Sequence, residues 1–182
     1  VRQLQGRIIA PTCSQFEAYG KMYFLPLRVQ NAQLRCEMPQ HAVEYLAGFF
    51  DGDGCADYSN KGARLAIVQS VANAKVLLFY RNVFGGAIYT SGAARGVSQP
   101  LLKWEITGDR AAHAATVLGS LPTCKQPQLR IMSSWPSQST APLEAVTDLR
   151  LLKHLSPMTS SCPSWAFLAG FFDAEGCIHL SL

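Results

Sequence analysis

The stretch that decides the fold is Tyr45-Leu46-Ala47-Gly48-Phe49-Phe50-Asp51-Gly52-Asp53-Gly54-Cys55, which returns as Phe167-Leu168-Ala169-Gly170-Phe171-Phe172-Asp173-Ala174-Glu175-Gly176-Cys177. The offset between the copies is 168 − 46 = 122 residues. This offset is far longer than a solenoid period and suits a duplicated domain of about 100 residues with a linker. The sequence stops six residues after Gly176, so we expect only the first helix of the second copy and the start of a strand.

Each copy predicts a helix that packs against another helix. Apolar and small residues surround the first helix on all sides over 43–50. Ala47 and Gly48 form a nearly side-chain-free patch, as do Ala169 and Gly170 in the second copy. Because another backbone can approach such a patch closely, we expect the two helices to pack side by side through these four residues.

Acidic residues stand at the C-terminal end of each predicted helix, where the helix dipole disfavours negative charge. Gly54 is expected to end the first helix in a left-handed conformation. Helices packed side by side would bring Asp53 and Glu175 together, and such paired carboxylates suit a hard cation, above all Mg²⁺. Asp51 and Asp173 are interpreted as polar helix-end groups rather than metal ligands.

Both segments resemble the LAGLIDADG motif of homing endonucleases, present here as LAGFFDGDG and LAGFFDAEG. The resemblance covers roughly 41–135 and implies that Asp53 and Glu175 hold metal ions at the centre of a DNA-cleaving site. It also implies that Gln69 orders water around the scissile phosphate. Lys125 would stabilise negative charge on the phosphate or polarise the attacking water. The alternative for Lys125 is an ordinary surface lysine in a loop that contains proline.

The region after Gly54 predicts an α+β fold. Apolar and β-branched patterns predict strands at 55–58, 63–70, 87–90 and 101–107. Helical periodicity predicts helices at 72–84, 111–118 and 129–135, the first of them stopped by Gly85-Gly86. The order helix, two strands, helix, two strands, helix allows one face of the sheet to stay uncovered. The family resemblance implies that this face is an antiparallel saddle along the major groove of DNA.

Polar residues on the predicted strands and loops are candidates for DNA contacts. Arg and Lys donate to guanine and to phosphate, and Asn or Gln pair with adenine in the major groove. The candidates are Tyr58, Asn60, Lys61, Arg64, Tyr89, Arg95, Gln99 and Lys103. For each of them the alternative is an ordinary solvated side chain, because most sheets carry polar residues on their solvent face.

The composition agrees with a polyanionic partner without identifying it. The net charge is +4 and the isoelectric point is about 8.8, yet only 15% of the residues are charged. Six cysteines without CxxC spacing predict reduced thiols in an intracellular compartment. The family resemblance alone suggests a chloroplast or a mitochondrion. No apolar run approaches the ~20 residues of a membrane span.

Four segments are expected along the chain. They are an extension of unknown role at 1–40, a first LAGLIDADG domain at 41–135, a linker rich in proline and serine at 136–163, and the start of a second domain at 164–182. The full-length protein would then be a monomer with two pseudo-symmetric halves.

Three functions remain open at this point. The first is a site-specific endonuclease that hydrolyses double-stranded DNA with a divalent metal. The second is a maturase that binds intron RNA, because the resembled family also uses its scaffold in this way. The third is an inactive remnant that folds its first half only.

Overall fold

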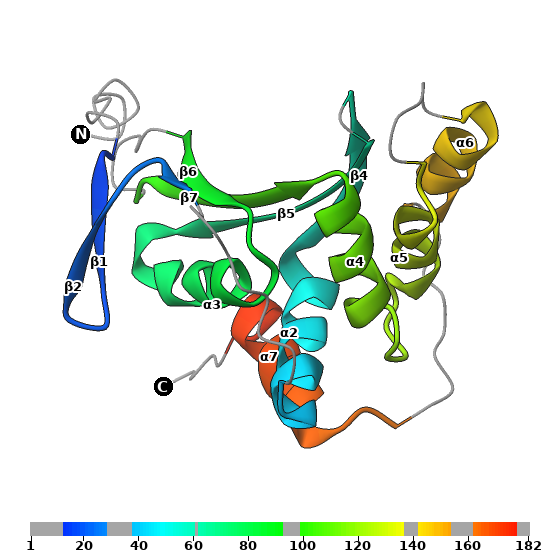
Figure 1. Cartoon of the computed structure of the whole chain (residues 1–182). Coiled ribbons are helices and arrows are strands. Elements are labelled where there is room, and N and C mark those ends of the chain that lie inside the picture. Colours follow the sequence, from blue (N-terminus) through cyan, green and yellow to red (C-terminus); the bar gives the residue numbers. More distant parts are fainter. Residues whose placement is uncertain are drawn as a thin grey trace, which may run out of the picture. The chain divides into compact units, whose positions relative to one another are not determined.

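The structure, a computed structural model of the chain, describes residues 13–28, 38–60, 62–92, 99–136, 142–153 and 162–177. The chain divides into two compact units. The first unit combines Val1–Leu34 with Ala66–Ile106, and the second combines Arg35–Leu65 with Thr107–Leu182. Figure 1 labels the helices and strands of both units.

The strands form a two-stranded sheet of order β1-β2 and a five-stranded sheet of order β3-β6-β7-β5-β4. Along the chain, the predicted succession of helix, two strands, helix, two strands and helix is confirmed. These elements are α2 (Gln40–Asp53), β4 (Gly54–Ser59), β5 (Gly62–Ser70), α3 (Ala74–Phe84), β6 (Ala87–Gly92), β7 (Leu101–Thr107) and α4 (Asp109–Leu118). The predicted α+β class is confirmed with them.

Trp104 lies at the centre of the first unit's core. It is fully buried on β7 and pairs in antiparallel register with Ile88 of β6. The rings of Tyr80 and Phe84 on α3 lie 5.0 and 6.4 Å from its ring. Its Nε1 donates a hydrogen bond of 2.8 Å to the carbonyl oxygen of Gly85. The glycine that ends α3 therefore also satisfies the one polar atom of the core tryptophan.

The segment before the first motif contributes strands to the first unit. β1 (Gln15–Ala18) and β2 (Lys21–Phe24) pair antiparallel. They are joined at Tyr19-Gly20, where both residues have positive φ, 52° and 68°, as a tight hairpin turn of this kind requires. β3 (Leu27–Arg28) then pairs antiparallel with β6. Part of the predicted extension is thus built into the edge of the five-stranded sheet.

Helices α5 (Gln126–Ser133), α6 (Leu143–Leu152) and α7 (Trp165–Glu175) complete the second unit. In this unit α4 packs against α5, α5 against α6, and α7 against α2 (Figure 1). α6 lies inside the predicted linker, and its Val146 and Leu149 are buried. This part of the linker is therefore a packed helix. Among the helices of the described residues, none has both the length and the apolar composition needed to cross a membrane.

Candidate active site

Helices α2 and α7 approach each other through their glycines. A Cβ atom at Gly48 would lie 2.8 Å from the carbonyl carbon of Phe167, and one at Gly170 would lie 2.9 Å from the carbonyl carbon of Tyr45. In both places the carbonyl oxygen is closer still. The two contacts are equivalent, because 170 − 48 = 122 and 167 − 45 = 122, which is the offset of the repeat. The helices therefore pack as pseudo-symmetric copies, backbone against backbone.

The two helices run in the same direction, so their C-terminal ends meet. One turn beyond the first glycine contact, a Cβ atom at Gly52 would lie 2.6 Å from Cβ of Ala174 and 3.0 Å from Cγ of Glu175. Ala174 and Glu175 lie farther along α7 than Phe167, just as Gly52 lies farther along α2 than Gly48. Asp53 is the last residue of α2, and Glu175 is the last residue of α7. Asp53 and Glu175, which were expected to lie together, thus end two helices whose last turns are in contact (Figure 1).

The two motif helices differ in how well their apolar faces are covered. In α2 the residues Leu46, Phe49 and Phe50 are at most 2% exposed. Their counterparts in α7 are 40–50% exposed: Leu168, Phe171 and Phe172. The predicted packing residues differ in the same way, since Ala47 is buried and Ala169 is exposed.

Two polar contacts tie α7 to α2. The hydroxyl of Tyr45 donates to Oδ2 of Asp173 at 2.8 Å. Ser164, the N-cap of α7, accepts from the backbone N–H of Phe167 and donates to Oε2 of Glu44 at 2.7 Å. Asp173, interpreted from the sequence as a helix-end group, therefore bonds to the partner helix.

The glycine after each acid ends its helix differently from the prediction. Gly54 has φ −72° and ψ 144°, so the expected left-handed conformation is wrong, and Gly176 is extended in the same way. The requirement for glycine is spatial. A Cβ atom would lie 2.5 Å from Cδ2 of Phe50 in the first copy and 2.5 Å from Cγ of Phe172 in the second. In both copies the backbone leaves the helix directly over the phenylalanine ring four residues earlier.

Lys125 is bound at the C-terminal end of α2. Its Nζ donates to three carbonyl oxygens, of Phe50 at 3.0 Å, Gly52 at 2.7 Å and Gly54 at 2.7 Å. An ammonium group has three hydrogens, so all of them are used here. A cation at this position also compensates the negative end of the helix dipole. A direct contact with phosphate would require Lys125 to exchange one of these bonds.

Asp51 holds the loop that carries Lys125. Its two carboxylate oxygens accept the backbone N–H groups of Cys124 at 3.0 Å and Lys125 at 2.9 Å. Burial lowers the pKa of Lys125, while electrostatic interactions with Asp51, Cys55, Asp53 and Glu175 oppose this shift. The ammonium group therefore lies within electrostatic reach of both acids that end the helices.

The donor set at the helix ends fits magnesium. No group of three or more His, Cys, Asp or Glu side chains suited to a metal ion occurs among the residues that the structure describes. Mg²⁺ does not need such a group, because it usually binds through one or two carboxylates and fills its shell with water and substrate phosphates. Asp53 and Glu175 supply one carboxylate from each helix. Both are hard oxygen ligands.

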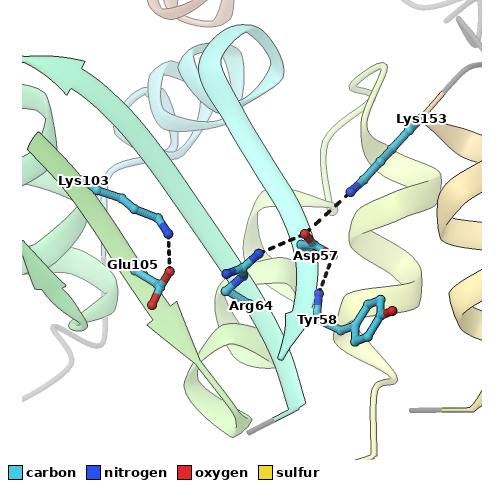
Figure 2. Close-up of polar contacts among 6 residues, drawn as sticks. All are labelled: Asp57, Tyr58, Arg64, Lys103, Glu105 and Lys153. Atoms are coloured by element: carbon cyan, nitrogen blue, oxygen red, sulfur yellow. Dashed lines mark hydrogen bonds and ion pairs between the residues drawn. The ribbon is translucent and has the colours of Figure 1, made fainter. Parts of the chain in front are cut away.

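The first pair of strands carries two of the predicted DNA contacts. The ring of Tyr58 stacks on that of Trp135, with centroids 5.4 Å apart and planes inclined by 12°. Nη2 of Arg64 donates to Oδ2 of Asp57 at 2.9 Å, which makes an ion pair (Figure 2). Both side chains are therefore held by neighbours in the same unit.

The second pair of strands carries two more. Lys103 on β7 forms an ion pair with Glu105 on the same strand (Figure 2). Its Nζ also lies 5.6 Å from the ring centroid of Tyr89. Burial lowers the pKa of Lys103, but hydrogen bonds to Glu105 and Tyr89 outweigh it, so the pKa is raised. Burial also raises the pKa of Tyr89, helped by its hydrogen bond to Glu105.

Two predicted glutamines have partners in the first unit. Gln69 is 9% exposed, and its Oε1 accepts from Nδ2 of Asn73 at 3.2 Å. Gln99 is exposed, and its Oε1 accepts the backbone N–H of Ala72 at 3.3 Å. The proposed action of Gln69 on water stays a prediction.

The DNA contacts of all these candidates stay predictions, and three candidates remain to be placed. Asn60 is exposed in the turn after β4. Lys61 and Arg95 lie outside the described residues.

Sequence reasoning missed the acids that pair with its basic candidates. Glu105 stands two residues from Lys103, and alternation along a strand puts both on one face, so this pair was open to prediction. Asp57 and Arg64 lie on two successive predicted strands, which placed them within reach without fixing the register. Lys153 also contacts Asp57, at 3.8 Å, and follows a helix inside the predicted linker, where no sequence signal pointed to a contact.

Several solved homing endonucleases resemble this chain in structure. The LAGLIDADG meganuclease I-AabMI, solved bound to uncleaved DNA, has 18% identity and a TM-score of 0.52, covering 73% of this chain and 57% of its own. The LAGLIDADG meganuclease I-CpaMI, also bound to uncleaved DNA, has 15% identity and a TM-score of 0.47, with 72% and 57% covered. The homing endonuclease I-CvuI, in a complex with DNA in the presence of Mg, has 16% identity and a TM-score of 0.42, with 64% and 97% covered.

This chain thus matches 57% of the length of the I-AabMI chain. No protein-family model and no curated protein matches the sequence. The TM-score of 0.52 with I-AabMI shows a shared fold. The chain has the fold of the LAGLIDADG homing endonucleases.

Proposed function

We propose that this chain is an endonuclease that cleaves double-stranded DNA at a specific site with the help of a divalent metal ion. The observation that carries the proposal is the pseudo-symmetric packing of α2 on α7, because it joins the ends of the helices that bear Asp53 and Glu175. The charge of Lys125 acts on both acids. Two acids and one lysine at the junction of two symmetric helices suit chemistry on a duplex with two pseudo-equivalent strands.

The residues at the junction would divide the work. Asp53 and Glu175 would hold Mg²⁺, which when bound lowers the pKa of a water molecule and neutralises charge on the leaving oxygen. Lys125, bound to three carbonyl oxygens, would hold one positive charge within electrostatic reach of both carboxylates. Asp51 would fix Lys125 through the two backbone N–H groups that it accepts.

The polar residues of the strands would bind the duplex. Arg64 and Lys103 would contact phosphates or guanine, and Tyr89 would support Lys103. Tyr58, Asn60, Lys61, Arg95 and Gln99 complete the proposed DNA surface, and Gln69 would order water. We further propose that the chain comprises a first LAGLIDADG domain at 41–135 and the start of a second domain at 164–182.

A DNA-binding chain without cleavage is the second candidate, and the exposed apolar face of α7 favours it. Leu168, Phe171 and Phe172 remain 40–50% exposed. A helix held on one side only would position Glu175 less firmly than Asp53. Precise placement of metal ligands is a condition of cleavage.

The decisive experiment is cleavage of a randomised duplex library by the full chain with Mg²⁺, followed by sequencing of the cut ends. The variants Asp53→Asn and Glu175→Gln should abolish cutting, and the matched control Asp148→Asn at an exposed position of α6 should not. Binding of the same library with Ca²⁺ should survive in all variants. Binding without cutting would favour the second candidate. Failure to bind any duplex, together with tight binding of structured RNA, would refute the proposal and favour a maturase.

A further inference from the structure

The helix inside the predicted linker brings a lysine to the β4–β5 hairpin. α6 packs against α5 and buries Val146 and Leu149. Its end is fixed by a hydrogen bond of 3.3 Å from Nε2 of Gln128 to the carbonyl oxygen of Leu152. Lys153 follows directly, and its Nζ lies 3.8 Å from Oδ2 of Asp57. The position of this lysine is therefore set by packed structure.

Asp57 receives contacts on both of its carboxylate oxygens. Oδ1 accepts the backbone N–H of Tyr58 at 2.9 Å, and Oδ2 is shared by Arg64 at 2.9 Å and Lys153 at 3.8 Å (Figure 2). The side chains of Asp57, Arg64 and Lys153 are 27%, 30% and 38% exposed. The three charged groups therefore lie next to one another and are still reachable from solvent.

The shared carboxylate changes what the two cations offer to DNA. A phosphate that approaches Arg64 or Lys153 also meets the negative charge of Asp57, and ion pairs at this degree of exposure are individually weak and exchangeable. A neutral acceptor such as the edge of guanine meets no such full repulsion. Because a guanidinium has five N–H donors in a rigid fork, a base contact can add to the bond with Asp57.

We propose that Asp57 is a specificity-determining residue, which competes with DNA phosphates for Arg64 and Lys153 and so weakens binding to DNA of arbitrary sequence. This inference rests on the proposed DNA-binding function. Discrimination is a difference between two affinities, and lowering the affinity for the wrong partner increases it as surely as raising the affinity for the right one. Asp57 would act by lowering the affinity for DNA of arbitrary sequence.

The test is the salt dependence of binding to a random-sequence duplex by the full chain and by Asp57→Asn, with Ca²⁺ in place of Mg²⁺ so that nothing is cut. Asparagine keeps the shape and the acceptor for Tyr58 and removes the charge. The variant should bind random duplex more tightly. Each further phosphate that the variant neutralises should steepen the loss of affinity between about 50 and 200 mM salt by about threefold. Asp148→Asn, which removes the same charge from an exposed position of α6, is the matched control.

A second variant covers the case in which Asp57→Asn does not fold. In Lys153→Gln the salt dependence of random-duplex binding should weaken, but by clearly less than the loss of one phosphate contact would cause. The reason is that Lys153 is already paired with Asp57. A decrease as large as one whole phosphate in Lys153→Gln would overturn the inference, and so would an Asp57→Asn variant that behaves like Asp148→Asn. If the wild-type chain binds no duplex at all, the proposed function fails, and the inference fails with it. If the wild type binds and only the Asp57 effect is missing, the inference alone fails.

Discussion

Replacing Gly48 with alanine should loosen the attachment of α7 to α2. The new Cβ atom would lie 2.8 Å from the carbonyl carbon of Phe167, whereas ordinary contacts begin at 3.4 Å. The carbonyl oxygen of Phe167 would be closer still, so the helices must separate by more than 3.4 − 2.8 = 0.6 Å at this point. The obstacle is backbone, so no side-chain rotation relieves it. A gap of this size forfeits a quarter to a half of the dispersion energy of each contact that it opens.

The expected cost follows from two opposing effects. Overpacking of a close interface costs about 2–3 kcal/mol when backbone must move. Alanine returns about 1 kcal/mol, because it favours a helix more than glycine does. The net loss of about 1–2 kcal/mol should raise the opening of α7 by about 5- to 30-fold. Gly170→Ala should have a similar effect, since its Cβ atom would meet the carbonyl carbon of Tyr45 at 2.9 Å.

Hydrogen exchange read by mass spectrometry measures this opening directly, with peptides of α4 as the internal reference. Ala169→Gly, at an exposed position of α7, gives the helix-propensity effect alone. The double variant of Gly48 and Gly170 should lose less than the sum of the single losses, because one separation of the helices relieves both contacts. Unchanged or slower exchange of α7 in Gly48→Ala would refute the backbone-to-backbone packing.

Two other changes test the ends of the helices. Lys125→Met removes three hydrogen bonds from carbonyl oxygens of α2, so urea unfolding should show a loss of about 3 kcal/mol, and a loss below about 1 kcal/mol would contradict the bonding described. Because burial lowers the pKa of Lys125, the unfolded chain binds more protons than the native one between that lowered pKa and 10.5. The stability of the wild type relative to Lys125→Met should therefore rise with pH through this window, and a flat difference curve would exclude the shift. Gly54→Ala places a Cβ atom 2.5 Å from Cδ2 of Phe50 and should cost about 1–3 kcal/mol in the same assay, whereas Gly92→Ala, whose Cβ atom would meet nothing nearer than 3.8 Å, serves as the mild control.

The sequence was sufficient for features that depend on pattern. The repeat predicted the two helices, and the small residues Gly48 and Gly170 indicated where these helices would contact each other. Alternation and helical periodicity were enough to place the strands β4 to β7 and the helix α3, because burial of one face leaves a trace in the order of residue types. These features are set by neighbours along the chain or by strict repetition.

Other features depend on distances that no local pattern records. Gly54 has the backbone of an ordinary extended residue, and only the position of the Phe50 ring explains why glycine stands there. The hydrogen bonds of Lys125 to three carbonyl oxygens form only when a loop more than 70 residues later folds onto the end of α2. Asp57 lay within the predicted hairpin, but nothing ranked it above its polar neighbours until Arg64 and Lys153 were seen to share its carboxylate.

Each of the two motif helices can serve as the reference for the other within the same molecule. Leu46, Phe49 and Phe50 are buried, while the same residue types 122 positions later are 40–50% exposed at Leu168, Phe171 and Phe172. Local sequence is almost constant between the two copies, so differences in ring dynamics or amide protection report chiefly on tertiary surroundings. A single sample thus compares a helix with buried apolar side chains and a helix of nearly the same sequence whose apolar side chains are partly exposed to solvent. Any additive, ligand or partner chain that covers α7 should make the spectrum of the second copy converge on that of the first.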